Sequence, residues 1–146
     1  MNKRIAIASD HAGYQMKLTI IRHLEDKGYQ VLDLGTDSSL PVDYPDFGHP
    51  LAEAVERGDF QRGISLCGSG NGINMVTNKH QGIRGALCWN TEIARLARGH
   101  NDANICSLPA RFIDQEQAIK IVDIFLNTPY DGGRHKKRIE KIPVHC

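Results

Sequence analysis

The sequence predicts an α/β protein with a three-layer α/β/α Rossmann-like fold, built on a five-stranded parallel sheet and followed by a C-terminal helical tail. Short apolar runs rich in β-branched residues alternate with longer amphipathic stretches, as in repeated strand–helix units. The apolar runs are nearly continuous, which is typical of strands buried on both faces. The chain has 146 residues, the size of one ordinary domain, and shows no repeat or linker. We therefore expect residues 1–146 to form a single domain.

Five apolar runs are expected to be the strands. Each is bounded by polar or turn-forming residues, and each is followed by a helical pattern or the tail. Right-handed crossovers between parallel strands would then place helices on both faces of the sheet. In chain order, the expected strands are 4–9, 30–35, 62–68, 84–89 and 103–109.

Helical patterns occupy the intervals between these strands. In the first, over 14–28, an apolar face and a terminal glycine indicate an amphipathic helix. The second, over 47–59, is weakened by Pro50 unless that residue lies in the first turn. The others cover 73–80, 90–99 and 114–127, with Asn90 or Thr91 and Asp114 as candidate caps. The apolar face of the first helix is predicted to comprise Tyr14, Leu18, Ile21 and Leu24.

The tail that follows Gly132–Gly133 is rich in basic residues and is expected to end in a short helix. Its arginines Arg134 and Arg138 are four residues apart and would share a helix face. Guanidinium groups bind phosphate with two parallel hydrogen bonds, so the pair is a candidate phosphate clamp. A solvated basic tail is the alternative, and a nucleic-acid contact has little support because no aromatic residues interleave with the charges.

Composition and charge exclude several classes of protein. The formal net charge of +1 argues against a protein-wide nucleic-acid surface. No apolar run approaches the roughly 18 residues of a membrane span, and the N-terminus does not read as a signal peptide. Cysteines at 67, 88, 106 and 146 show no C-x-x-C spacing. We expect a cytoplasmic protein with reduced thiols, no membrane or nucleic-acid partner, no metal and no cofactor.

The sequence Cys67-Gly68-Ser69-Gly70-Asn71-Gly72 ends the third expected strand. Ligands of open parallel sheets bind beyond the carboxyl ends of the strands, where the strand order reverses. The loop matches neither the dinucleotide pattern G-x-G-x-x-G nor the P-loop. It can be a tight strand-to-helix turn, or a loop whose amides hold an anion. At this position Cys67 is a candidate nucleophile or general base, whereas Cys88 and Cys106 are expected to be small buried hydrophobes.

Two further pairs of residues are candidates for a role beside Cys67 or in proton transfer. Asp10 and His11 follow the first strand and would face Cys67 if the first and third strands are neighbours, although Asp10 can equally be a helix cap. His100 and Asn101 precede the fifth strand, at the wrong end of that strand to face Cys67. A neighbouring subunit, or a helix that extends over the sheet edge, would be needed to bring them in. A helix C-terminal cation is the alternative interpretation of His100.

The chain resembles the ribose/galactose isomerase family, and within it the type B ribose-5-phosphate isomerases. The resemblance spans nearly the whole chain in the order and spacing of the family. It is carried by "IASDHAG" (7–13), "DYPDF" (43–47), "CGSGNGINM" (67–75), "NKHQGIRGALC" (78–88), "RGHNDANI" (98–105) and "GGRHKKRI" (132–139).

The resemblance implies an aldose–ketose isomerase that interconverts ribose 5-phosphate and ribulose 5-phosphate through a cis-enediolate, in the non-oxidative branch of the pentose phosphate pathway. It implies that Cys67 is the general base and that amides of 68–72 form the anion hole. Ser69 stands where many members have threonine. Ile73, Asn74 and Met75 offer no carboxylate, so the chain resembles the cysteine branch rather than the glutamate branch.

The remaining roles are also implied by the resemblance. His100 would open the sugar ring, and Asp10 and Asn101 would hold sugar hydroxyls or the ring oxygen. Tyr44 would flank the sugar. The phosphate would be bound by His11, Arg134 and Arg138, with Arg111 contributed by the second subunit. The resemblance therefore implies a homodimer with sites at the subunit interface, or a dimer of dimers.

Three alternatives stay open at this point. The substrate can be a six-carbon sugar phosphate, galactose 6-phosphate or allose 6-phosphate. The chain can be a phosphate-binding module without catalysis, in which case Cys67→Ala leaves its function intact. It can also be a thiol-redox protein that uses Cys67, although no nearby cysteine in the sequence offers a resolving partner.

Overall fold

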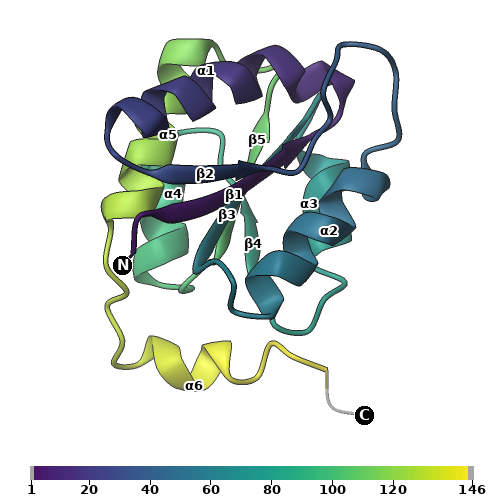
Figure 1. Cartoon of the computed structure of the whole chain (residues 1–146). Coiled ribbons are helices and arrows are strands. Elements are labelled where there is room, and N and C mark those ends of the chain that lie inside the picture. Colours follow the sequence, from purple (N-terminus) through teal and green to yellow (C-terminus); the bar gives the residue numbers. More distant parts are fainter. Residues whose placement is uncertain (1, 145–146) are drawn as a thin grey trace.

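The computed structural model describes residues 2–144 and shows a parallel sheet covered by helices on both faces (Figure 1). The strands are β1 (Arg4–Ser9), β2 (Gln30–Asp33), β3 (Arg62–Cys67), β4 (Gly85–Leu87) and β5 (Ile105–Pro109). The helices are α1 (Tyr14–Asp26), α2 (Pro45–Glu56), α3 (Asn71–Thr77), α4 (Thr91–Gly99), α5 (Gln115–Asn127) and α6 (His135–Ile139), with a 3-10 turn η1 at His11–Gly13. The predicted α/β class and five parallel strands are confirmed.

The sheet has the order β2-β1-β3-β5-β4, with every neighbouring pair parallel. The chain passes from β1 to β2 on one side and then crosses to β3 on the other side of β1. The strand order therefore reverses between β1 and β3, which is where an open parallel sheet binds its ligand. Asp10 was expected to face Cys67 only if the first and third strands are neighbours. The observed order makes β1 and β3 neighbours.

Two apolar layers hold the sheet between its helices. On one face α1, α4 and α5 bury a cluster that includes Ile20, Ile121 and Phe125. On the other face α2 packs with Leu51 and Val55 over β1 and β3, and α3 lies beside it. The three-layer prediction is thereby confirmed. In the described part of the chain, no helix has the length and apolar character needed to cross a bilayer.

The expectation that every strand is buried on both faces is wrong for the two edge strands. Residues of β1, β3 and β5 are almost all buried, but β2 is largely exposed and β4 is only half-buried. Each edge strand has one neighbour, and Leu32 of β2 is 42% exposed. Both edge strands are also shorter than predicted, because pairing ends at Asp33 and at Leu87.

Helix α1 differs from prediction in register, and helix α2 differs in its start. The buried face of α1 consists of Met16, Lys17, Ile20 and Leu24, rather than the face through Tyr14, Leu18 and Ile21. Helix α2 begins at Pro45, so Pro50 lies inside the helix and not in its first turn. The predicted caps are confirmed, since Asn90 accepts from the amide of Ile93 and Asp114 from that of Gln117.

Lys17 is a charged residue with no solvent exposure. Its Nζ donates to the carboxylate of Asp33 and to the carbonyl oxygen of Thr36, each at 2.5 Å. A buried ammonium is tolerated only when it is paired and hydrogen-bonded, as it is here. The contact ties α1 to the loop that follows β2, and that loop forms one wall of the candidate site.

Candidate active site

The carboxyl ends of β1, β3 and β5 meet at one edge of the sheet. Strand pairing aligns Ser9 with Leu66, and Cys67 with Pro109. The amide of Asp10 donates to the carbonyl oxygen of Leu66 at 3.2 Å. Asp10 therefore lies directly beside the strand end that carries Cys67, as the sequence predicts.

Asp10 caps the short turn η1. Its Oδ1 accepts hydrogen bonds from the amides of Ala12 at 2.9 Å and Gly13 at 3.2 Å, and the residue is 7% exposed. The capping role considered as an alternative is thus present. Both bonds use the same oxygen, so the cap does not require the second carboxylate oxygen.

His11 is fixed in a single tautomer by the loop that follows β2. Its Nδ1 accepts a hydrogen bond from the amide of Val42 at 3.1 Å. A neutral imidazole with an accepting Nδ1 carries its proton on Nε2. His11 therefore presents an N–H donor, which suits an anionic ligand such as a phosphate.

The glycine loop between β3 and α3 is closely enclosed by side chains and neighbouring backbone. Gly70 has φ of +77°, and a Cβ there would lie 2.5 Å from the side chain of Leu87 and 3.1 Å from the backbone of Leu108. A Cβ on Gly72 would lie 2.6 Å from the ring of Tyr44. The positive φ and the backbone contacts explain why glycine is needed at Gly70, and the contact at Gly72 places Tyr44 against the loop.

The loop also carries a serine and an arginine neighbour. The Oγ of Ser69 accepts from the amide of Asn71 at 3.2 Å. A Cβ on Gly68 would lie 3.1 Å from Nη1 of Arg111, whose amide donates to the carbonyl oxygen of Gly68 at 2.9 Å. The side chain of Arg111 therefore lies against the glycine loop of its own chain.

Cys67 is a free thiol, 5% exposed, at the last position of β3. The next three residues lead into α3, which starts at Asn71 rather than at residue 73 as predicted. Cys88 and Cys106 are fully buried and behave as expected of small core residues. A hydrogen bond to Cys88, together with burial, raises the pKa of the Cys106 thiol well above its ordinary value. Cys146 lies outside the described residues.

The other predicted site residues gather at the opposite end of the sheet. His100 and Asn101 follow α4, and Arg134 and Arg138 belong to the α6 region, which lies below the amino ends of the strands (Figure 1). All four line one cavity of about 380 Å³. Within one chain, this cluster and Cys67 lie at opposite ends of β5, in which each residue adds about 3.3 Å of length.

His135 joins this cluster although the sequence gave no reason to single it out. Its ring stacks on that of His100, with centroids 4.3 Å apart and planes 16° from parallel. Desolvation, followed by the charges of His100 and Arg134, lowers the pKa of His135. The signal that could have found it is its place between the two arginines of the tail.

His100, His135 and Asp131 each bring a potential ligand atom to within 4.8 Å of the others. Two imidazoles and a carboxylate suit a transition-metal ion. The sequence predicts no metal site, because Asp131 and His100 are far apart in the chain. Metal dependence of any activity therefore needs a direct test with a chelator.

The chain resembles known proteins over nearly its full length. The family model described as Ribose/Galactose Isomerase matches residues 5–142. Ribose-5-phosphate isomerase B of Escherichia coli is 42% identical over 140 residues, which cover 96% of this chain and 94% of that protein.

Solved structures agree. The ribose 5-phosphate isomerase structure from Thermotoga maritima is 48% identical, with a TM-score of 0.96 over 98% of this chain and 99% of that one. Ribose-5-phosphate isomerase B of Mycoplasma genitalium, solved with bound ribulose 5-phosphate, is 42% identical, with a TM-score of 0.93 over 97% and 95% of the two chains.

Proposed function

The chain belongs to the ribose/galactose isomerase family, and from this premise we propose that it is an isomerase interconverting ribose 5-phosphate and ribulose 5-phosphate. The observation that supports a reaction here is the thiol of Cys67 beside Asp10 and the glycine loop, at the point where the strand order reverses. We place the reaction in the non-oxidative pentose phosphate pathway and the chain in the cytoplasm, as a single isomerase domain spanning 1–146.

The reaction moves one proton between neighbouring carbons of the open-chain sugar. The Cys67 thiolate takes the proton from C2 of the aldose, which leaves a cis-enediolate with its charge on O1. A proton passes from O2 to O1, and the thiol returns its proton to C1 to form the ketose. A positioned base typically accelerates such a step by about 10²–10⁴-fold. The amides of 68–72 and the hydroxyl of Ser69 face the oxygen on which negative charge develops, and one such donor is typically worth about 2.7–4 kcal/mol.

The remaining roles divide between ring opening and phosphate binding. His100 transfers the proton that opens the sugar ring, Asp10 and Asn101 hold its oxygens, and Tyr44 flanks it. His11, through its Nε2–H, and the guanidinium groups of Arg134 and Arg138 bind the phosphate. Phosphate binding at a distance from the reacting carbons fixes their orientation.

These roles require two chains for each site. Cys67, Asp10 and His11 lie at one end of the sheet, whereas His100 and the two tail arginines lie at the other. A homodimer in which the His100 cluster of one chain meets the glycine loop of its partner completes both sites at once. A dimer of dimers satisfies the same requirement. Arg111 was expected to serve the partner's site, but its position over Gly68 suits the site of its own chain as well.

Turnover of ribose 5-phosphate by the purified protein, with a chelator present, is the first test. We expect activity that does not depend on metal and that falls by about 10²–10⁴-fold in Cys67→Ala. Galactose 6-phosphate and allose 6-phosphate are assayed in parallel and should be poorer substrates. A folded protein that turns over none of the three sugars contradicts the catalytic proposal and favours a phosphate-binding module. Activity abolished by the chelator contradicts the metal-free mechanism.

Subunit complementation tests the shared site. Cys67→Ala and His100→Ala variants are each expected to be inactive, and are mixed under conditions that exchange subunits. Half of the dimers are then mixed, and each has one intact site of two, so about a quarter of the wild-type activity should return. Mixed dimers that are detected by native mass spectrometry but remain inactive would place both residues in one chain's site.

A further inference from the structure

A second cavity opens at the amino ends of the strands, at the same end of the sheet as the His100 cluster. It has a volume of about 430 Å³ and shares no lining residue with the His100 cavity. Its walls come from the chain before β1, the start of β3, the end of α4 and the segment that follows α5. The lining residues are Lys3, Tyr29, Arg62, Arg98, Leu126, Asn127, Thr128, Pro129 and Tyr130.

The charge of this cavity is positive. Lys3, Arg62 and Arg98 line it, and no Asp or Glu does so among the residues that the structure describes. Arg98 is only 2% exposed. Burial of a guanidinium group at that depth is costly unless an anion or several acceptors accompany it.

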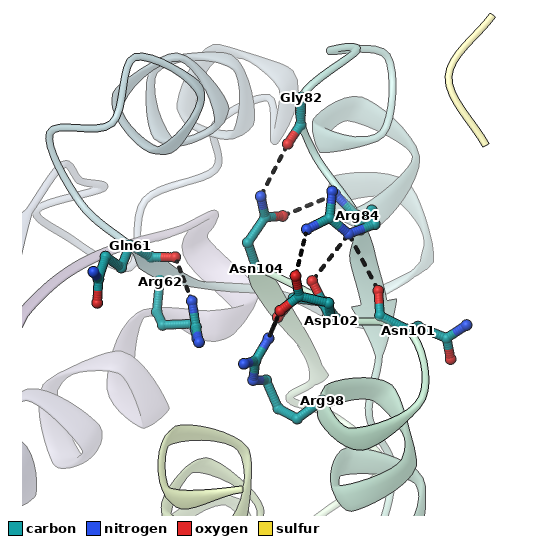
Figure 2. A network of polar contacts seen from close by, with 9 residues as sticks. Gln61, Arg62, Gly82, Arg84, Arg98, Asn101, Asp102 and Asn104 are labelled. Atoms are coloured by element: carbon teal, nitrogen blue, oxygen red, sulfur yellow. Dashed lines mark hydrogen bonds and ion pairs between the residues drawn. The ribbon is translucent and has the colours of Figure 1, made fainter. Parts of the chain in front are cut away.

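One nearby carboxylate compensates part of this charge. Figure 2 shows Asp102 between two arginines: its Oδ1 accepts from Nη1 of Arg98 at 2.8 Å, and its Oδ2 accepts from Nη2 of Arg84 at 3.2 Å. Arg98 also donates to the carbonyl oxygen of Ala103 at 2.7 Å. Asp102 is therefore fully engaged with two cations, and Arg62 remains without a carboxylate of its own among the described salt bridges.

Unpartnered buried polar atoms are concentrated among the residues that line this cavity. Four buried side-chain polar atoms lack a hydrogen-bond partner in the described part of the chain, and three of them belong to lining residues: Nε of Arg62, Nε of Arg98 and the hydroxyl of Tyr130. Buried polar groups in folded proteins nearly always have partners. The two guanidinium Nε atoms can only donate and the tyrosine hydroxyl can also donate, so one acceptor group could serve all three.

We propose that this cavity binds the phosphate group of a small phosphorylated molecule, at a site separate from the isomerase site. Three unpartnered donors and three cations match the acceptor oxygens and negative charge of a phosphate monoester. The volume exceeds that of a phosphate ion and lies in the range of small-molecule sites.

The electrostatics of Arg62 agree with this proposal. Burial and the nearby charge of Arg98 lower the pKa of Arg62 to about 10. The guanidinium stays charged at neutral pH, and the charge of Asp102 offsets only part of the cost of its burial. A bound phosphate would offset more of it.

The test is a calorimetric titration with inorganic phosphate at fixed ionic strength, with chloride as the matching salt. The proposed isomerase site is weakened by Arg134→Gln and Arg138→Gln, so that binding in this double variant reports mainly on the cavity. We expect one phosphate per chain to remain bound. Addition of Tyr130→Phe should weaken that binding about 10-fold, and addition of Arg62→Gln by 10-fold or more.

The substitutions are chosen so that the fold is expected to be kept, and thermal unfolding of each variant checks this. Tyr130→Phe removes a hydroxyl without a partner, so thermal unfolding should be unchanged. Arg57→Gln removes an exposed arginine outside the cavity and controls for overall charge. The proposal is overturned if the double variant binds no phosphate, or if Tyr130→Phe and Arg62→Gln bind it as well as Arg57→Gln does.

Glycerol 3-phosphate distinguishes the source of the phosphate group. Tighter binding than inorganic phosphate supports a phosphorylated metabolite, and equal binding supports free phosphate. Both support the proposed site chemistry, and neither depends on turnover. Failure of the isomerase assay therefore leaves this result intact, and the reverse also holds.

Discussion

Gly70→Ala is expected to destabilise the protein strongly, because the residue combines an unusual backbone angle with close packing. Its φ is +77°. A methyl group there would lie 2.5 Å from Cδ1 of Leu87, and 3.1 Å from backbone atoms of Leu108 and Pro109. Leu87 can change its rotamer, but the two backbone atoms cannot move without disturbing β5.

The two costs can be assigned separately. A non-glycine residue in the left-handed region costs roughly 1–2 kcal/mol. Overpacking of a well-filled interior typically costs about 1–3 kcal/mol. Together they predict a loss of about 2–5 kcal/mol in the free energy of unfolding. At about 2–4 °C per kcal/mol, the melting temperature should fall by roughly 4–20 °C.

Gly28→Ala is the matched control. Gly28 has a similar φ of +88° at the end of α1, but nothing lies within 4 Å of the position its Cβ would take. It should show only the backbone cost, about 1–2 kcal/mol. Urea denaturation of both variants measures the difference. Equal losses for Gly28→Ala and Gly70→Ala would show that the glycine loop is not packed as described, and would refute the reasoning.

Three further predictions concern the site and its surroundings. Gly72→Ala should push the exposed ring of Tyr44 aside. The free energy of unfolding should change by less than about 0.5 kcal/mol, while KM for ribose 5-phosphate should rise in steady-state assays. Lys17→Met removes the buried ammonium that anchors the loop holding His11. The free energy of unfolding, measured by urea denaturation, should fall by about 1–3 kcal/mol, and kcat/KM should fall as well. An unchanged kcat/KM would contradict the link between the loop and the site. The lowered pKa of His135 means that, as pH falls below 6.5, the unfolded chain binds a proton before the folded chain does. Its contribution to stability is therefore present above pH 6.5 and lost as pH falls through the lowered pKa, so His135→Gln should flatten the acid side of a plot of unfolding free energy against pH.

The layers and strands could be predicted because each strand and each helix has a recognisable hydrophobic pattern in its own stretch of sequence. What the pattern does not contain is strand order. The exposure of β2 and β4 follows from their places at the sheet edges, which depend on pairing between distant segments. The burial of Lys17 was missed for a similar reason, since its acceptors Asp33 and Thr36 belong to a different part of the chain.

Some features of the candidate site could likewise be predicted from the sequence, and others could not. Asp10 and Cys67 could be located because residues that follow parallel strands meet at one sheet edge. The stacking of His135 on His100 could not, because it joins the end of α4 to α6 across more than one element. The cavity lined by Arg62 and Arg98 was also missed, since nothing local distinguishes a buried arginine from a solvated one.

The separation of the Cys67 loop from the His100 cluster also affects how activity depends on the amount of protein. On the proposed assembly, a lone chain carries two incomplete halves and no complete site. Where most chains are unassociated, the concentration of sites rises with the square of the chain concentration. A twofold dilution would then lower the turnover per unit volume by about three-quarters. Well above the dissociation constant of the dimer, turnover becomes proportional to the amount of chain. The protein's abundance would then control not only how many catalysts a cell holds but whether they exist at all.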